Sequence, residues 1–311
     1  MKYAVRLRVS LALVVLLLGF SAGVLPSASA DPVASAPTII SPTPGQVIRD
    51  QSFNVQFTRA DGVSSVRIFI DEGTSAARTF DVSVSGAPVN VPGSGPHTIR
   101  IANIESDGSA GMSSPTQSFT LVLPPPGPPG ISINAGAQYT NSRHVTLKVV
   151  WPAYYRDGMI IDNDGGFANF QSPELAATVP WTLVGSGDEK LPKTVYVRFV
   201  RVDPSFSGTT YSEQTFTDDI VLDLTSPVVK AATSTSSRGP VAQRLAARRY
   251  KVRVRATDKV SGVAQVQFAT KKAHPRGLRK FDRKAFVLKK APRFVRVVDL
   301  AGNYSAWKRI A

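Results

Sequence analysis

Cysteine is absent from the 311 residues of this chain. If the protein is exported, as its N-terminus predicts, disulfide bonds are excluded and packing alone must stabilise the fold. The sequence also lacks a His-Glu-x-x-His metal motif, a Gly-x-Ser-x-Gly nucleophile motif and a glycine-rich phosphate loop. These absences remove the common signatures of hydrolases and nucleotide-binding proteins.

Histidine is also scarce, with three residues, at positions 97, 144 and 274. They lie in separate segments, so a catalytic histidine would have to find its partner across segments. We therefore expect no enzyme, no cofactor and no metal site. A pair of carboxylates suited to glycoside hydrolysis is the one catalytic alternative that a single sequence leaves open.

Long apolar runs are missing except at the N-terminus. Lys2, Arg6 and Arg8 precede an apolar run over residues 11–20, and Ala28-Ser29-Ala30 follows. This order is typical of a secretory signal peptide over residues 1–30 and predicts a secreted, extracellular protein, with cell-wall association a further option. An uncleaved N-terminal anchor is the alternative. No later stretch approaches the ~18 apolar residues of a membrane helix, so we expect no transmembrane segment after cleavage.

Helical spacing is not found beyond the N-terminal segment, whereas period-2 alternation is common. Short alternating runs recur between Gly, Pro, Asp, Asn and Ser breaks, which is typical of an all-β fold. The clearest apolar sets are Phe53, Val55 and Phe57; Val66, Ile68 and Ile70; His97, Ile99 and Ile101; Phe119, Leu121 and Leu123; Val145, Leu147, Val149 and Trp151; and Tyr250, Val252, Val254 and Ala256.

Two markers repeat along the chain. An arginine at the centre of a strand pattern recurs at positions 100, 198 and 296, at intervals of 98 residues. An aspartate that follows an earlier strand recurs at positions 61, 157 and 258. Two markers in the same order predict tandem copies of one domain. Each copy is close to the ~100 residues of an immunoglobulin-like sandwich.

These copies occupy residues 36–123, 131–225 and 226–311. The proline-rich stretch PPPGPPG at 124–130 separates the first two and predicts a stiff polyproline spacer. We therefore expect an all-β protein of three tandem immunoglobulin-like β-sandwich domains after an N-terminal signal peptide.

The chain resembles tandem bacterial immunoglobulin-like domains of secreted and surface proteins. The resemblance rests on residues 131–134, 139–143, 181–183, 193–199 and 219–223 of the second copy, and on residues 256–258, 261–263 and 299–303 of the third. The second copy departs from the family pattern at residues 203–208, where an Ala-Gly-Asn turn is expected. The first copy is equally similar to fibronectin type III domains. The resemblance implies β-sandwiches with a spacer, adhesion or binding role and brings no catalytic residues.

Charge is distributed very unevenly. Residues 31–227 hold 12 Lys and Arg against 19 Asp and Glu, whereas residues 228–311 hold 22 against 3. The net charges are therefore −7 and +19. A positive field of this density attracts polyanions. A solvated surface that keeps the protein soluble is the alternative.

Part of the positive charge is patterned. Lys251, Arg253 and Arg255 share one face of a strand whose other face is apolar, so they should form a ridge. We assign as candidate polyanion-binding residues Arg248, Arg249, Lys251, Arg253, Arg255, Lys271, Lys272, Arg279 and Lys280. Arg276, Arg283, Lys284, Lys289 and Lys290 continue the basic stretch.

The expected partner is an anionic polymer of the cell wall or extracellular space, such as a teichoic-type polymer, an acidic polysaccharide or anionic lipid headgroups. Phe281 and Phe286 are the only aromatic residues near the basic loops, which is too few for a base-stacking surface. We therefore expect no specific nucleic-acid binding. A protein or glycan partner held by the sandwich loops is the second option, and we expect a monomer.

Two smaller features have structural and functional interpretations. The turn Asp162-Asn163-Asp164-Gly165-Gly166 hints at calcium, but Gly166 stands where an EF-hand needs an oxygen ligand, which favours a structural turn. Asp258 and Asp299 likewise fit turn or cap residues. Trp151, Trp181 and Trp307 lie in strand patterns and should pack in the cores, with stacking on sugar rings as the alternative.

Overall fold

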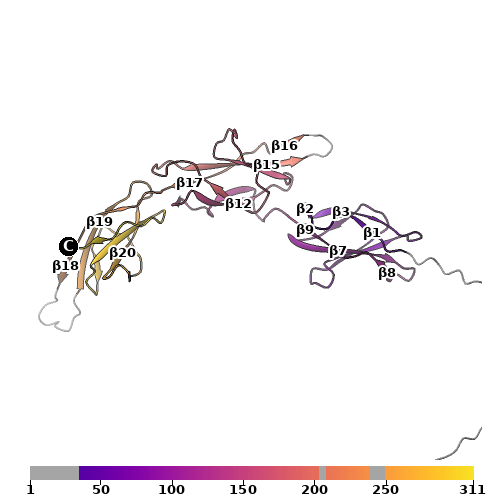
Figure 1. Cartoon of the computed structure of the whole chain (residues 1–311), viewed down its shortest axis with the longest axis horizontal. Coiled ribbons are helices and arrows are strands. Elements are labelled where there is room, and N and C mark those ends of the chain that lie inside the picture. Colours follow the sequence, from indigo (N-terminus) through magenta and orange to yellow (C-terminus); the bar gives the residue numbers. More distant parts are fainter. Residues whose placement is uncertain (1–34, 203–207, 238–248) are drawn as a thin grey trace, which may run out of the picture.

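The structure is a computed structural model that describes residues 35–202, 208–237 and 249–311. The predicted signal peptide and Arg248 lie outside these ranges. Within them the regular structure is entirely β, arranged as three two-sheet sandwiches that follow one another along the long axis (Figure 1). The predicted all-β fold of tandem sandwiches is therefore confirmed.

The first sandwich packs a three-stranded sheet, β1-β3-β6, against a five-stranded sheet, β2-β9-β7-β4-β5, to which β8 adds through β7. Its strands are β1 (Thr38–Ser41), β2 (Gln46–Ile48), β3 (Ser52–Thr58), β4 (Val66–Ile70), β5 (Arg78–Val82), β6 (Ala87–Asn90), β7 (Gly95–Ile104), β8 (Ala110–Ser113) and β9 (Gln117–Leu121). The alternating residues Val55, Ile68 and Ile99 are fully buried between the sheets, as the period-2 pattern predicts.

The second sandwich repeats this layout with sheets β10-β12-β14 and β11-β17-β15-β13, and β16 pairs with β15. Its strands are β10 (Gly130–Ile133), β11 (Tyr139–Thr140), β12 (His144–Val150), β13 (Gly158–Asp162), β14 (Thr178–Thr182), β15 (Lys193–Val202), β16 (Thr209–Tyr211) and β17 (Phe216–Leu222). Trp151 and Trp181 are buried in its core, so these two tryptophans follow the packing interpretation.

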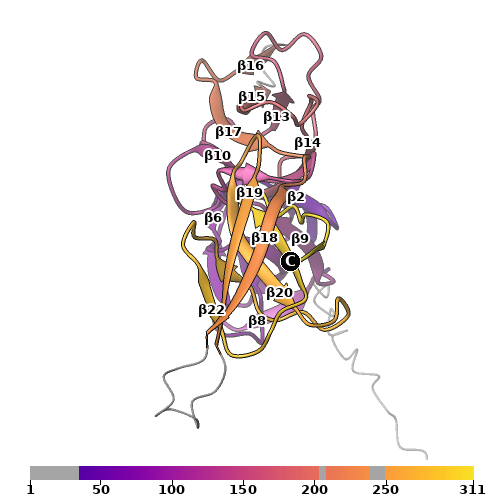
Figure 2. The same cartoon turned by 90° about the vertical axis from the view of Figure 1, so that its left-hand side faces the viewer.

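The third sandwich has sheets β18-β19-β22 and β21-β20-β23-β24. Its strands are β18 (Val228–Ser237), β19 (Arg249–Thr257), β20 (Val263–Ala269), β21 (Arg279–Lys280), β22 (Phe286–Leu288), β23 (Phe294–Asp299) and β24 (Lys308–Arg309). Figure 2 shows β18 and β19 side by side over their length. The core is small, with Phe268 as its one fully buried aromatic residue among those described.

The arginine marker occupies the same place in each sandwich. Arg100 lies on β7, Arg198 on β15 and Arg296 on β23. Each guanidinium stacks on an aromatic ring, Phe69 at 4.2 Å, Phe167 at 4.9 Å and Tyr304 at 4.2 Å from the ring centroid. These cation–π contacts explain why one residue type recurs on an outward strand face.

A serine also repeats across from each arginine, which strand periodicity alone does not predict. Ser114, Ser212 and Ser305 are buried. Each serine hydroxyl accepts a hydrogen bond from the backbone N–H of the residue after the arginine, at 3.1, 3.1 and 2.9 Å. Each serine N–H donates back to the carbonyl of that same residue. The internal repeat therefore extends to one hydrogen-bonded corner per sandwich.

Candidate polyanion-binding surface

The basic ridge lies on the middle strand of the outer three-stranded sheet of the third sandwich. Along β19 the side chains of Val252 and Val254 are buried, whereas Lys251, Arg253 and Arg255 are exposed. The alternation comes from the strand geometry, which places neighbouring ridge charges about 7 Å apart. The predicted ridge is therefore formed.

The strand beside the ridge brings no opposing charge. Across the pairing with β18, Lys251 faces Thr235, Arg253 faces Thr233 and Arg255 faces Ala231. Six ion pairs occur among the described residues, and all of them lie in the first two sandwiches or between them. The positive charge of the described part of the third sandwich is thus not neutralised within the chain.

The other edge of β19 opens onto a groove. β22 pairs only with residues 250–252 of β19, so the half of β19 that carries Arg253 and Arg255 faces the segment 281–285 instead. Three adjoining hollows of about 730, 650 and 560 Å³ follow this segment. Their basic lining residues are Lys230, Arg253, Arg255, Arg279, Lys280, Arg283 and Lys284. Ridge and groove form one surface, which we call the β19 face.

The assigned residues differ in whether they join the β19 face. Arg249 is exposed at the start of β19, and Arg279 and Lys280 form β21 at the rim of the groove. Lys271 and Lys272 instead lie in the turn after β20 of the opposite sheet, where Lys272 Nζ stands 5.2 Å from the ring centroid of Phe294. They line none of the three hollows. Arg248 lies outside the described ranges.

Arg283 and Lys284 were not among the assigned residues, although they line the groove. The sequence offered only the basic run that contains them, because the segment between β21 and β22 has no strand periodicity. Asp282 is the one acidic residue of this segment, and its carboxylate accepts the backbone N–H of Lys284 at 3.0 Å. Phe281 and Phe286 are half-buried against the core, and the remaining part of each lines a hollow, which leaves little aromatic surface for stacking.

The sequence-based candidates outside the third sandwich have structural partners. Asp162 accepts backbone N–H bonds from Asp164 and Asn169, and the Asn163 side chain bonds with Trp181 Nε1 and the Thr182 carbonyl. These are the contacts of a turn. Trp307 of the third sandwich departs from the core-packing prediction. It lies outside the strands and the core cluster, half-buried under Arg296, whose guanidinium lies 4.6 Å from its ring centroid.

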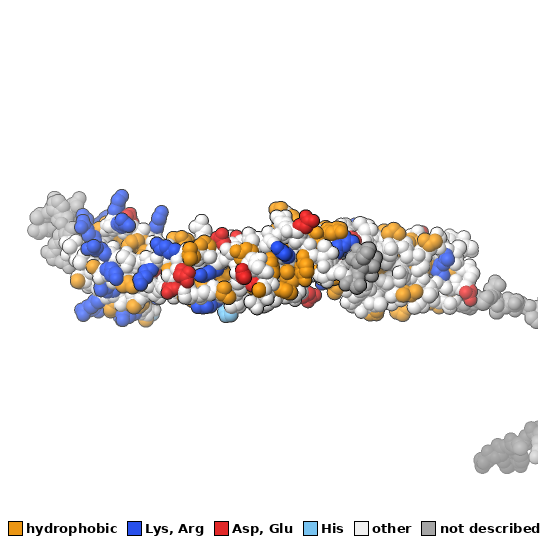
Figure 3. Space-filling model, turned by 90° about the horizontal axis from the view of Figure 1, so that it is seen from above, with side chains coloured by type: hydrophobic (Ala, Val, Ile, Leu, Met, Phe, Trp, Pro, Cys, Tyr) orange, Lys and Arg blue, Asp and Glu red, His pale blue; other side chains and the backbone are white. Residues whose placement is uncertain are grey.

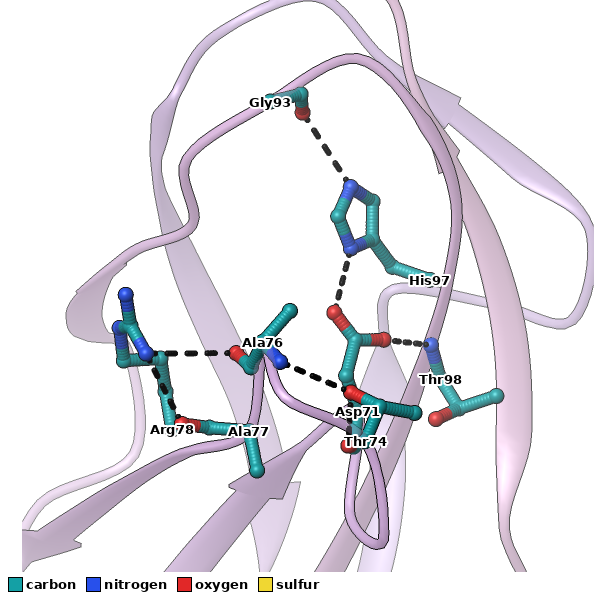
Figure 4. Close-up of polar contacts among 8 residues, drawn as sticks. All are labelled: Asp71, Thr74, Ala76, Ala77, Arg78, Gly93, His97 and Thr98. Carbon is teal, nitrogen blue, oxygen red and sulfur yellow. Dashed lines mark hydrogen bonds and ion pairs between the residues drawn. The ribbon is translucent and has the colours of Figure 1, made fainter.

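His97 forms a buried pair with Asp71 in the first sandwich (Figure 4). Its Nδ1 lies 2.7 Å from Asp71 Oδ2 and its Nε2 lies 3.2 Å from the Gly93 carbonyl oxygen. The other Asp71 oxygen accepts the Thr98 N–H at 2.9 Å. Each ring nitrogen thus faces an oxygen of the first sandwich, and the pair fixes the orientation of the ring. His144 and His274 are exposed and belong to the second and third sandwiches, so neither lies near His97 in the sequence.

Space-filling Figure 3 shows the resulting asymmetry, with Lys and Arg side chains gathered at the end formed by the third sandwich and acidic side chains more frequent elsewhere. Among the described residues, no helix has the length and hydropathy needed to cross a membrane.

Comparison with known proteins gives similarity of fold only. No protein-family model matches the chain, and no curated protein matches it. The crystal structure of the chicken CNTN1 FN1–FN3 domains is similar at 15% identity and a TM-score of 0.45, covering 89% of this chain and 97% of that one.

Two further arrays are similar at lower scores. The fibronectin(III)-like modules of Clostridium thermocellum CbhA match at 15% identity and a TM-score of 0.24, covering 60% of this chain and 94% of that one. The central fibronectin-III array of RIM-binding protein matches at 11% identity and a TM-score of 0.24, covering 90% of this chain and 98% of that one. All three structures are described as fibronectin type III or fibronectin(III)-like domains.

Proposed function

We propose that the protein is a secreted, non-enzymatic array of sandwiches whose third domain attaches to an anionic polymer of the cell surface or extracellular space. The first two sandwiches act as spacer or adhesion modules that extend away from the attachment point. The observation that carries the proposal is the β19 face, whose ridge and groove charges form no ion pair with any described residue.

Three features of the β19 face suit a polymer with repeating negative charge. The ridge charges repeat at about 7 Å along a straight strand, which allows a linear polymer to contact several of them at once. Arg253, Arg255 and Arg283 line the same hollow, so guanidinium groups approach a bound chain from two sides and can bond its oxygens in bidentate fashion. The weak stacking surface favours charge recognition over recognition of bases.

Electrostatic attachment predicts which residues matter. In the intact chain, replacing Lys251, Arg253 and Arg255 by Thr removes three charges while keeping residues that suit an exposed strand position. The matched control replaces Arg293, Lys308 and Arg309 by Thr, which removes the same charge from the residue before β23 and from β24 on the opposite side of the sandwich. The probes are long-chain inorganic polyphosphate and polygalacturonate, which carry phosphate and carboxylate charges.

The ridge variant should bind both probes roughly a hundredfold more weakly at 0.1 M salt, since about two counterions fewer are released on binding. The control variant should lose far less affinity. Equal losses in the two variants would show that net charge alone, without the β19 face, attracts the polymer. Binding of polygalacturonate that persists at high salt in the ridge variant would favour a glycan site in the sandwich loops.

A further inference from the structure

Three carboxylates meet where the second sandwich is joined to the third. Asp223 follows the last residue of β17, Asp258 follows β19, and Asp299 ends β23. One carboxylate oxygen from each lies within 4.8 Å of the others. Asp223 is completely buried, Asp299 is 3% exposed and Asp258 is half-buried, so the three carboxylates are placed together with little access to water.

The backbone fixes each of the three side chains. Asp223 Oδ1 accepts bonds from the Thr225 N–H and hydroxyl, and its Oδ2 accepts the Ser261 N–H at 3.0 Å. Asp258 Oδ1 accepts the N–H groups of Val260 and Gly262 at 3.0 and 2.8 Å. These bonds give Asp258 the turn role that the sequence predicts. Asp299 accepts two hydrogen bonds from Asn303 and is likewise a turn residue, as predicted. The cluster is therefore preorganised.

One oxygen of the cluster is left without a partner. Asp258 Oδ2 exposes less than 1 Å² and has no hydrogen-bond partner among the described residues. Its sister oxygen is already occupied by two N–H groups, so Oδ2 is the atom available to a ligand. A buried carboxylate oxygen without a donor costs free energy, and a cation would offset that cost.

No basic side chain of the described residues forms an ion pair with the cluster. The six ion pairs of the described residues do not include Asp223, Asp258 or Asp299. Three carboxylates held this close together call for a counter-charge.

We propose that Asp223, Asp258 and Asp299 bind a calcium ion that fastens the end of the second sandwich to the third. Oxygen ligands select a hard cation. Ca²⁺ accepts a flexible arrangement of six to eight oxygens, whereas Mg²⁺ demands a near-ideal octahedron, which fits less well with carboxylates already held by backbone N–H groups.

The position gives the ion a mechanical role. Asp223 belongs to the connection between the sandwiches, whereas Asp258 and Asp299 belong to the third sandwich. Two hydrogen bonds already cross here, from Ser261 N–H to Asp223 Oδ2 and from Asn303 Nδ2 to the Asp223 carbonyl. A bound ion adds a third link at the same point, so it stiffens this junction.

Calorimetric titration of the intact, chelator-treated chain with CaCl₂ tests the proposal. We expect one ion per chain with a Kd at or below the roughly 10⁻⁴–10⁻³ M of extracellular calcium modules, and weaker binding of Mg²⁺. Asp258→Asn, which keeps the shape and removes the charge, should weaken binding at least tenfold. The matched control Asp164→Asn, in the turn after β13, should bind as the unchanged protein does.

Hydrogen exchange on the unchanged chain gives a readout that needs no variant. Added Ca²⁺ should protect the amides of Val260, Gly262 and Asn303, which donate to the ligating carboxylates. Absence of binding at 10 mM CaCl₂, equal binding by Asp258→Asn, or protection confined to residues 162–166 would each overturn the proposal. A preference for Mg²⁺ would overturn the choice of ion.

Discussion

In each sandwich the middle strand of the three-stranded sheet (β3, β12 or β19) turns one face to the core and one to solvent. The core-facing residues are of the same kind in all three strands, whereas the solvent-facing residues differ. The inward positions are valines, leucines and phenylalanines, such as Val55 and Phe57 on β3, Val145 and Leu147 on β12, and Val252 and Val254 on β19. The outward positions are Ser52, Asn54 and Gln56 on β3, His144, Thr146 and Lys148 on β12, and Lys251, Arg253 and Arg255 on β19. Inward residues determine the fold, and outward residues are free to determine binding.

The same contrast extends to how charge is handled. In the first sandwich arginines pair with nearby carboxylates, as Arg67 does with Asp81 and Arg100 with Glu72. The Arg67 hydrogen bonds lower the pKa of Asp81, and the Arg100 hydrogen bonds lower the pKa of Glu72. The third sandwich has almost no acidic residues with which to form such pairs. Its surface field therefore reaches solvent and any polyanion there.

The two junctions also differ. Between the first and second sandwiches, Arg156 pairs with Asp50 at 2.9 Å and Arg49 approaches Glu174 at 3.8 Å. Between the second and third, three carboxylates converge without a basic partner. One junction neutralises its own charge, whereas the other requires a cation from outside. Calcium should therefore stiffen the second junction and leave the first unchanged.

The largest expected change in stability comes from a substitution on the core-facing side of the third sandwich. Phe268→Ala should lower the free energy of unfolding of the third sandwich by about 3–5 kcal/mol, because it leaves a cavity in a small core. The outward ridge variant described above should change it by less than about 1 kcal/mol. Calorimetric unfolding measures both. If the ridge variant were the more destabilised of the two, the separation of fold and binding would be wrong.

A somewhat smaller effect should follow from His97→Ala in the first sandwich. The substitution leaves the buried Asp71 carboxylate without its ring partner, which should cost about 2–4 kcal/mol. His144→Ala is the matched control, since His144 is exposed and bonds only the Thr182 hydroxyl. Urea unfolding at neutral pH compares the two. Equal stability of both variants would show that the His97–Asp71 pair contributes nothing.

The smallest of the stability effects is expected at the repeated serines, and it tests whether the three sandwiches share the same hydrogen-bonded corner. Replacing Ser114, Ser212 or Ser305 by Ala leaves one buried backbone N–H without its acceptor in each sandwich, at a cost of about 1–3 kcal/mol. The three costs should be similar, because the three corners have the same bonds. Thermal unfolding of the single variants provides the values. A cost near zero in one sandwich would remove that corner from the repeat.

Sequence alone predicted the parts of the molecule that are governed by strand periodicity. Alternation located the buried faces of β3, β12 and β19 and placed Lys251, Arg253 and Arg255 on one exposed face. It did not separate Arg283 and Lys284, which line the groove, from Lys271 and Lys272, which do not. Those residues lie in turns and connections, where chain direction depends on tertiary packing and not on a local pattern.

The carboxylate cluster escaped sequence analysis for a related reason. The sequence predicts Asp258 and Asp299 as turn residues. That role accounts for Asp258 Oδ1, which accepts two backbone N–H groups, but not for Oδ2, which has no partner among the described residues. Asp223 is 35 residues from Asp258 and 76 from Asp299 in the sequence. Only the docking of the second sandwich onto the third brings the three side chains together, and no spacing rule encodes that approach.

The salt dependence of polyphosphate binding tests the role of the β19 face most directly. The logarithm of the binding constant should fall linearly with the logarithm of the salt concentration. The slope for the variant with Thr at positions 251, 253 and 255 should be shallower than that of the unchanged chain by about two. An unchanged slope in that variant would mean that polymer is held elsewhere and would contradict the account.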